Sequence, residues 1–359
     1  MLIARAPLRI SFAGGGTDLP AYYERYGGVV VSTTIDKYVY VHASPNGSDE
    51  AQITSADYHT FYQHHCGVPM NWEGELSLPR AVLHEFGISN GISLFLASEV
   101  PPGTGLGSSS AITVALVGAV AAYLQRPLSR QQIAELACHI ELGKLAAPIG
   151  KQDQFAAAFG GLNSIRFDGD GVTVEPVRLP SGALQQLERR LLLFFTGTAR
   201  DSAAILREQQ RASAQGQAET VEGLHRIKEA ALHCRRCLES GDLDAVGQLL
   251  DEGWRQKRRL AAGITNPRID EVYQMALQHG ALGGKITGAG GGGFLLLYSR
   301  EAHQASLADA MERLGLRRMG FRFDAQGLSF APADWGKGNW LNTGHASEAA
   351  PLVPGPASP

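Results

Sequence analysis

A glycine- and serine-rich run occupies residues 101–110: Pro101-Pro102-Gly103-Thr104-Gly105-Leu106-Gly107-Ser108-Ser109-Ser110. The apolar segment 94–100 before it predicts a strand, and the apolar segment 111–124 after it predicts a helix. Backbone N–H groups at a helix start lack partners within the helix, and the helix dipole adds about half a positive charge there. Glycines let a ligand approach the backbone, and serines supply hydroxyl groups. The run therefore predicts a phosphate site, with a plain serine-capped turn as the alternative.

Two further glycine-rich runs lie near the two ends of the chain, at 9–18 (RISFAGGGTD) and 283–293 (GGKITGAGGGG). The 43 glycines among 359 residues make up roughly 12%, against a usual ~7%, and they are clustered. The last run contains G-x-G-x-x-G at 288–293, but a predicted strand at 294–298 follows it. A dinucleotide-binding fingerprint requires a helix at that place. We therefore do not expect an oxidoreductase of the Rossmann type.

Length and charge restrict the class of protein. The chain is long enough for two domains. Its formal net charge of −3 gives no reason to expect nucleic acid or an anionic membrane as a partner. The longest apolar run, at 111–124, is too short to span a bilayer. The N-terminus lacks the apolar region of a signal peptide. We expect a cytoplasmic protein.

The local patterns predict mixed helices and strands. Strands are expected at 29–34, 38–43, 94–100, 162–167, 172–176, 191–196 and 294–298. Helices are expected at 111–124, 129–142, 152–159, 203–212, 220–239, 243–260 and from 267 to about 279. The end of the chain, 335–359, is rich in Pro, Ala, Gly and Ser, which predicts a flexible tail.

The three runs, in this order and spacing, resemble the motifs of the GHMP kinases, the superfamily of galactokinase, homoserine kinase and mevalonate kinase. The resemblance covers residues 1–330 and rests on two motifs, Pro-x-Gly-x-Gly-Leu-Gly-Ser-Ser and Lys-x-x-Gly-Ala-Gly-Gly-Gly. It implies a two-domain α+β fold: a ribosomal-S5-domain-2-like α/β domain at 1–187 and a ferredoxin-like α+β domain at 188–334. It also implies ATP and Mg²⁺ as cofactors.

Two segments, at 5–20 (RAPLRISFAGGGTDLP) and 150–154 (GKQDQ), are most similar to the corresponding motifs of kinases of D-glycero-α-D-manno-heptose 7-phosphate. This resemblance implies phosphorylation of the anomeric hydroxyl to give the 1,7-bisphosphate. Two alternatives stay open: an anomeric kinase for a sugar without a phosphate, such as fucose or galactose, and a non-catalytic sensor that binds sugar and ATP. The expected partners are ATP and a sugar phosphate, and a second copy of the chain is a further candidate.

The family's motifs assign roles on the ATP side of the site. ATP is expected to bind Pro102, Gly103, Gly105, Leu106, Gly107, Ser108, Ser109 and Ser110. Glu141 and Ser109 match the Mg²⁺ ligands, Asp153 the catalytic base, and Arg9 the cation that holds it. The breaker at 147–150 lies between the two carboxylates and can bring both to one cleft. Because phosphoryl transfer depends on positioning and charge neutralisation, Asp153 serves either as a base or to orient the nucleophile.

The sugar side is less fully defined by the sequence. Asp18 matches the family's sugar ligand, with an Asx-turn residue as the alternative. The other expected substrate contacts are Gly15, Gly16, Thr17, Gly290, Gly291 and Arg200. A phosphate on the sugar requires cations, and the candidates are Lys37, Lys144, Lys151 and Arg200. Arg200 follows the turn at 196–198 and could equally be a surface arginine. Lys285, in the third run, is expected to be structural.

Overall fold

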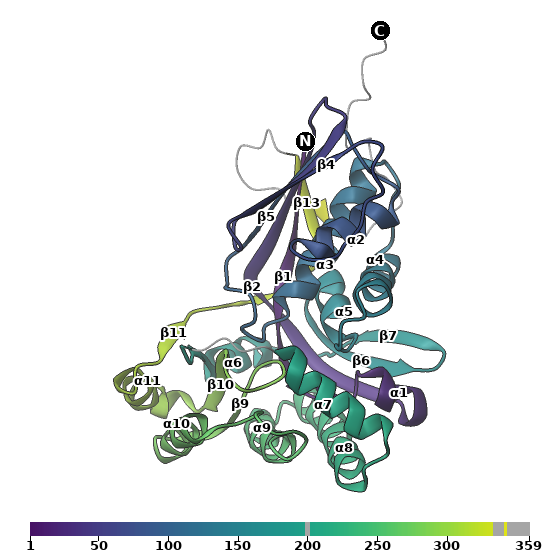
Figure 1. The fold of residues 1–359 in the computed structure, drawn as a ribbon. Coiled ribbons are helices and arrows are strands. Elements are labelled where there is room, and N and C mark those ends of the chain that lie inside the picture. Colours follow the sequence, from purple (N-terminus) through teal and green to yellow (C-terminus); the bar gives the residue numbers. More distant parts are fainter. Residues whose placement is uncertain (198–201, 333–340, 343–359) are drawn as a thin grey trace.

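The structure is a computed structural model that describes residues 1–197, 202–332 and 341–342. Arg200 and most of the expected tail therefore lie outside the described residues. The described residues form two sheets, one above the other in Figure 1. No helix in the described part of the chain is long and apolar enough to cross a membrane.

The first sheet has ten strands, with β14-β13-β1-β2-β5-β3-β4 as its main order and β6, β7 and β12 attached through β2. A single long strand at 28–45 replaces the two strands expected at 29–34 and 38–43, because β1 pairs along nearly all of it. The strands are β1 (Leu2–Ala13), β2 (Gly28–Pro45), β3 (Glu50–Ser55), β4 (Thr60–His65), β5 (Ile92–Ser98), β6 (Leu162–Asp168), β7 (Gly171–Pro176), β12 (Phe323–Asp324), β13 (Ser329–Pro332) and β14 (Leu341–Asn342).

Helices cover one face of this sheet (Figure 1). The central one, α3, is buried along most of its length, which agrees with its apolar sequence. It begins at Ser108, so the three serines form its first turn. The helices of this first half of the chain are α1 (Pro20–Tyr26), α2 (Ser77–Glu85), α3 (Ser108–Tyr123), α4 (Arg130–Cys138), the π-helix η1 (His139–Lys144) and α5 (Gln152–Phe159).

The second sheet is antiparallel, in the order β11-β8-β10-β9. Its strands are β8 (Leu191–Phe195), β9 (Ala281–Ile286), β10 (Phe294–Ser299) and β11 (Arg317–Met319). The helices of this half are α6 (Ala183–Arg190), α7 (Ser202–Ala214), α8 (Ala218–Ser240), α9 (Leu243–Lys257), α10 (Pro267–Gln278), the 3₁₀ turn η2 (Glu301–His303) and α11 (Gln304–Arg313). The third glycine run leads into β10, so no helix follows it, as expected.

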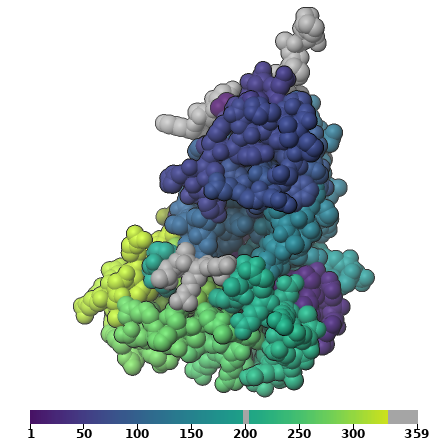
Figure 2. Space-filling model, in the orientation of Figure 1, coloured from purple at the N-terminus to yellow at the C-terminus, as the bar shows by residue number. Residues whose placement is uncertain are grey.

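The two halves share structure at two places. The main hydrophobic core contains residues of α8 and α9 together with β1, β2 and α3. Late in the chain, β12 pairs with β2 and β13 pairs with β1, so residues 323–332 return to the first sheet. Figure 2 shows the upper and lower parts of the molecule with a recess between them. The candidate site lies where the two halves meet.

Candidate active site

The second glycine run forms a loop that ends at the start of α3. Gly103, Gly105 and Gly107 have φ angles of 75°, 83° and 79°, in the left-handed region. Gly107 precedes the first turn of α3, whose serines line a cavity of about 220 Å³. Pro102, Gly103 and Ser109 also line an adjoining cavity of about 590 Å³. The loop and the helix start can therefore hold an anion beside a larger hollow.

The second and third glycine runs pack backbone against backbone. The carbonyl of Thr104 accepts hydrogen bonds from the Thr287 hydroxyl and the Phe294 N–H, at 3.3 Å each. A Cβ on Gly105 would lie 2.4 Å from the carbonyl oxygen of Thr287, and one on Gly288 would lie 2.5 Å from the Gly105 Cα. Glycine is therefore required on both sides of this contact, which joins the two halves at the site.

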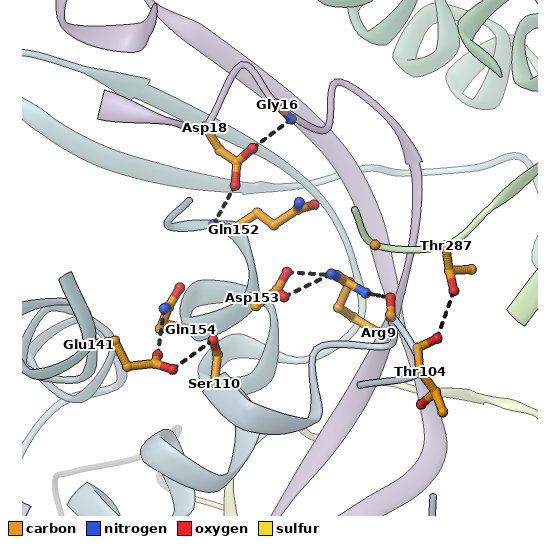
Figure 3. A network of polar contacts seen from close by, with 12 residues as sticks. Arg9, Gly16, Asp18, Thr104, Ser110, Glu141, Gln152, Asp153, Gln154 and Thr287 are labelled. Carbon is orange, nitrogen blue, oxygen red and sulfur yellow. Dashed lines mark hydrogen bonds and ion pairs between the residues drawn. The ribbon is translucent and has the colours of Figure 1, made fainter. Parts of the chain in front are cut away.

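Arg9, in β1, holds Asp153 in a two-point ion pair. Its Nε and one terminal nitrogen donate to the two carboxylate oxygens, at 2.8 Å each, and its other terminal nitrogen donates to the Gly105 carbonyl at 2.7 Å (Figure 3). Arg9 is 3% exposed. Such forked pairs fix both distance and orientation. Arg9 therefore positions Asp153, in the first turn of α5, against the phosphate loop.

Glu141 is a buried carboxylate at the helix start. Its two oxygens accept hydrogen bonds from Ser110 Oγ at 3.2 Å and Gln154 Nε2 at 2.6 Å (Figure 3). Burial raises its pKa to about 7, against the effect of these two hydrogen bonds. No described basic side chain forms an ion pair with it. An oxygen-ligated cation would supply the missing charge, so these residues fit a Mg²⁺ ion.

The backbone around Glu141 differs from the expected helix at 129–142. The α-helix ends at Cys138 and continues as a π-helix over 139–144. Single π-turns are rare and are often found at functional sites. The wider turn places Glu141 at 2% exposure beside Ser110. Local sequence patterns do not predict it.

Asp18 lies at the sugar end of the predicted site. Its carboxylate accepts hydrogen bonds from the Gly16 N–H at 2.8 Å and the Gln152 N–H at 3.3 Å (Figure 3). It is 4% exposed and lines the 220 Å³ cavity, and burial raises its pKa. The expected contact residue Thr17 instead bonds its hydroxyl to the carbonyls of Gly14 and Val29. Thr17 therefore shapes the loop from inside.

The cavity brings together most of the predicted site residues, with some differences. Arg9, Asp18, Ser109, Glu141 and Asp153 all line it. The third run contributes Gly288 and Ala289, whereas the expected Gly290 and Gly291 pack against Ile264 outside that lining.

The described lysine candidates for a sugar phosphate lie outside the cavity lining. Lys37 pairs with Asp36 at 3.6 Å, and Lys144 pairs with Glu85. Lys151 lies over the ring of Tyr23, at 4.9 Å.

Two polar lining residues from the second half of the chain were not predicted from the sequence: Gln209 of α7 and Lys257 of α9. Both stand on the apolar face of their helix. Lys257 follows Leu250 and Trp254 at helical spacing, and Gln209 follows Ile205 by four residues. A polar residue in such a row is the signal that could have identified them, because most polar residues of an amphipathic helix face water.

Comparisons with known proteins agree with this geometry. Family profiles described as "GHMP kinases N terminal domain" and "GHMP kinases C terminal" match residues 77–161 and 234–315. The D-glycero-alpha-D-manno-heptose 7-phosphate kinase of Campylobacter jejuni is 31% identical over 331 residues, covering 90% of this chain and 97% of the relative. The bifunctional fucokinase/GDP-fucose pyrophosphorylase of Arabidopsis thaliana is 26% identical, over 83% of this chain and 30% of the relative.

A solved structure shows the same fold. The D-glycero-D-manno-heptose 1-phosphate kinase from Bacteroides thetaiotaomicron superposes with a TM-score of 0.76 at 28% identity, covering 92% of this chain and 99% of that one. The chain thus belongs to the GHMP kinases. It is an ATP-dependent phosphotransferase that acts on a sugar. The family and the two-domain fold predicted from the three glycine runs are confirmed.

Proposed function

We propose that this kinase transfers the γ-phosphoryl group of ATP to the anomeric hydroxyl of D-glycero-D-manno-heptose 7-phosphate. The products are the 1,7-bisphosphate and ADP. The names of the C. jejuni relative and the B. thetaiotaomicron structure support a heptose as the acceptor. The fucokinase relative supports the alternative, an anomeric kinase for a sugar without a phosphate.

The position of Asp153 carries the proposal. A Cβ on Gly107 would lie 3.1 Å from the Asp153 carboxylate, so this oxygen lies beside the phosphate loop. Arg9 fixes its direction. The carboxylate accepts the hydrogen bond of the sugar's anomeric hydroxyl and aims that oxygen at the terminal phosphorus. A new P–O bond forms as the bond to the β-phosphate breaks, and the hydroxyl proton passes to Asp153.

The remaining roles follow from the cavity. ATP phosphates bind the N–H groups and hydroxyls at Gly107–Ser110, where the helix dipole favours negative charge. Glu141 and Ser109 would hold Mg²⁺, which neutralises phosphate charge when bound. Asp18 accepts hydrogen bonds from sugar hydroxyls. Because transfer passes through a loose transition state, holding these groups in place accounts for most of the catalysis.

An ADP-release assay across sugars tests the acceptor. Heptose 7-phosphate is expected to give a kcat/KM at least 100-fold above those of free heptose, fucose and galactose. Equal or higher turnover with a free sugar would contradict the heptose 7-phosphate assignment. No turnover with any sugar, despite ATP binding, would indicate a sensor.

Asp153→Asn tests the proposed catalytic residue. The amide keeps the shape of the side chain but cannot accept the proton, so turnover should fall by at least 1,000-fold, in line with the loss of a positioned acid–base group. ATP affinity, measured by calorimetry, should stay within about threefold of the wild type because the phosphate loop is unchanged. Retained turnover would remove Asp153 from this role.

A further inference from the structure

Gln209 presents an unpaired donor to the catalytic cavity. The side chain is 2% exposed, and its Nε2 has no hydrogen-bond partner in the structure. It lies against the loop that carries Asp18, because a Cβ on Gly16 would be 2.5 Å from Nε2. Buried amide groups are rarely left unpaired. A ligand with acceptor oxygens in the cavity would satisfy this donor.

Lys257 brings a positive charge to the same cavity. The residue is 8% exposed, and its Nζ donates one hydrogen bond, to the Gly288 carbonyl. Within the described ranges, no carboxylate forms an ion pair with it. An ammonium group has three N–H donors, so two remain for a ligand. Burial and the nearby Arg9 lower its pKa to about 8, while Asp18 and Asp153 act in the opposite direction.

The two side chains come from the second half of the chain and meet the sugar-side loop. Gln209 contacts Gly16, and Lys257 lines a small hollow together with Gly14, Gly15 and Lys285. Arg9 is already paired with Asp153. In the lining of the 220 Å³ cavity, Lys257 is therefore the cation whose charge has no carboxylate partner among the described residues.

We propose that Lys257 and Gln209 bind the phosphate group that the sugar already carries. This rests on the proposed function, and it replaces the lysines suggested by the sequence. The ligand is a phosphate monoester dianion: Lys257 supplies charge and two N–H donors, and Gln209 supplies an amide donor. Gly15 lines both hollows, and the nearest atoms to a Cβ there would be side-chain atoms at 3.7 Å and 3.8 Å. A sugar without the phosphate would leave both groups unsatisfied, which gives selectivity.

The test measures selectivity rather than activity alone. Wild type, Lys257→Met and Gln209→Leu are assayed with heptose 7-phosphate and with free heptose. For Lys257→Met, kcat/KM should fall at least 100-fold for the phosphorylated sugar and less than threefold for free heptose. Gln209→Leu should show the same pattern, with a loss of at least tenfold. The KM for ATP should be unchanged in both.

Matched variants control for charge and for folding. Lys37→Met removes the positive charge of a lysine that the sequence suggested but that lies outside the cavity lining. Gln210→Leu replaces a glutamine by leucine at the next position of α7. Both should keep the wild-type preference. Lys257→Arg should recover part of it. Calorimetry with inorganic phosphate as the probe, in the presence of ADP, should show weaker binding in Lys257→Met than in the wild type.

The outcomes separate this proposal from the one on which it rests. If the wild type shows no preference for the phosphorylated sugar, the proposed acceptor is wrong. If it shows the preference and Lys257→Met keeps it, the subsite is wrong. An equal loss with both sugars, accompanied by a higher KM for ATP, would place Lys257 on the ATP phosphates and overturn the subsite.

Discussion

The side chain of Arg9 contacts two parts of the site, the carboxylate of Asp153 and the phosphate loop. It binds both oxygens of Asp153 and the carbonyl of Gly105. The planar guanidinium is suited to this three-way contact, and a lysine could not reproduce it. Arg9 thus holds Asp153, the proposed acceptor of the sugar proton, in a fixed position relative to the phosphate loop.

The charge of Lys257 predicts a pH dependence. Phosphate binding requires the protonated amine, and the pKa of this amine is lowered to about 8. The kcat/KM for the sugar phosphate should therefore fall as pH rises through about 8. Phosphate monoesters are already dianions there. In Lys257→Arg the fall should disappear up to about pH 10, because arginine stays protonated.

A steady-state pH profile of both enzymes checks this expectation. Burial is the main cause of the lowered pKa of Lys257, Arg9 adds to it, and Asp18 and Asp153 oppose it. A decline at the same pH in the wild type and in Lys257→Arg would assign the decline to another group.

At the scale of elements, the contact between the two glycine loops predicts the effect of Gly105→Ala. The added Cβ would lie 2.4 Å from the Thr287 carbonyl and would push the loops apart. The KM for ATP should rise at least tenfold, and the free energy of unfolding should fall by more than the ~1–2 kcal/mol of left-handed backbone strain alone.

Gly87→Ala provides the matched control. Gly87 has a φ of 68°, and a Cβ there would meet nothing within 4 Å. It therefore carries the backbone strain without the collision. Chemical denaturation and ATP kinetics of both variants make the comparison. Equal losses of stability, with an unchanged KM for ATP, would show that the contact between the loops is unimportant.

Elements with strong local signals could be predicted. The helix expected at 152–159 has these bounds, and Asn266 caps α10 by accepting a hydrogen bond from the Ile269 N–H at 2.9 Å. β9 was missed because its glycines do not resemble a strand. A Cβ on Gly283 would lie 2.1 Å from the Gly247 carbonyl of α9, so packing between elements selects glycine there.

The site residues likewise divide into those that the sequence predicts and those that depend on packing between distant elements. Arg9, Asp18, Glu141 and Asp153 stand in motifs, and the structure brings them to one cavity. The π-turn around Glu141 and the side chains from α7 and α9 depend on how distant elements pack. Sequence periodicity places Lys257 on the apolar face of its helix, but it does not show that this face meets a cavity.

At the scale of the whole molecule, the return of residues 323–332 to the first sheet predicts the effect of truncation. Removing the chain after Arg322 leaves the edge of β1 unpaired and takes β12 from β2. Unpaired edges lower stability and promote aggregation. The truncated protein should therefore lose protection in the first half of the chain, and not only near the cut.

Amide hydrogen exchange measures this directly. Amides of β1 and β2 should exchange at least tenfold faster after truncation, while those of β8 and β10 should change less. The reverse order, with the loss confined to the second sheet, would contradict the shared sheet.

The central claim is that the cleft phosphorylates an anomeric hydroxyl. Phosphorus and proton NMR of the product from ATP and heptose 7-phosphate tests it most directly. We predict one new phosphate signal, coupled to the anomeric proton, alongside the retained 7-phosphate. A new phosphate coupled to any other ring proton, or no product at all, would contradict the account.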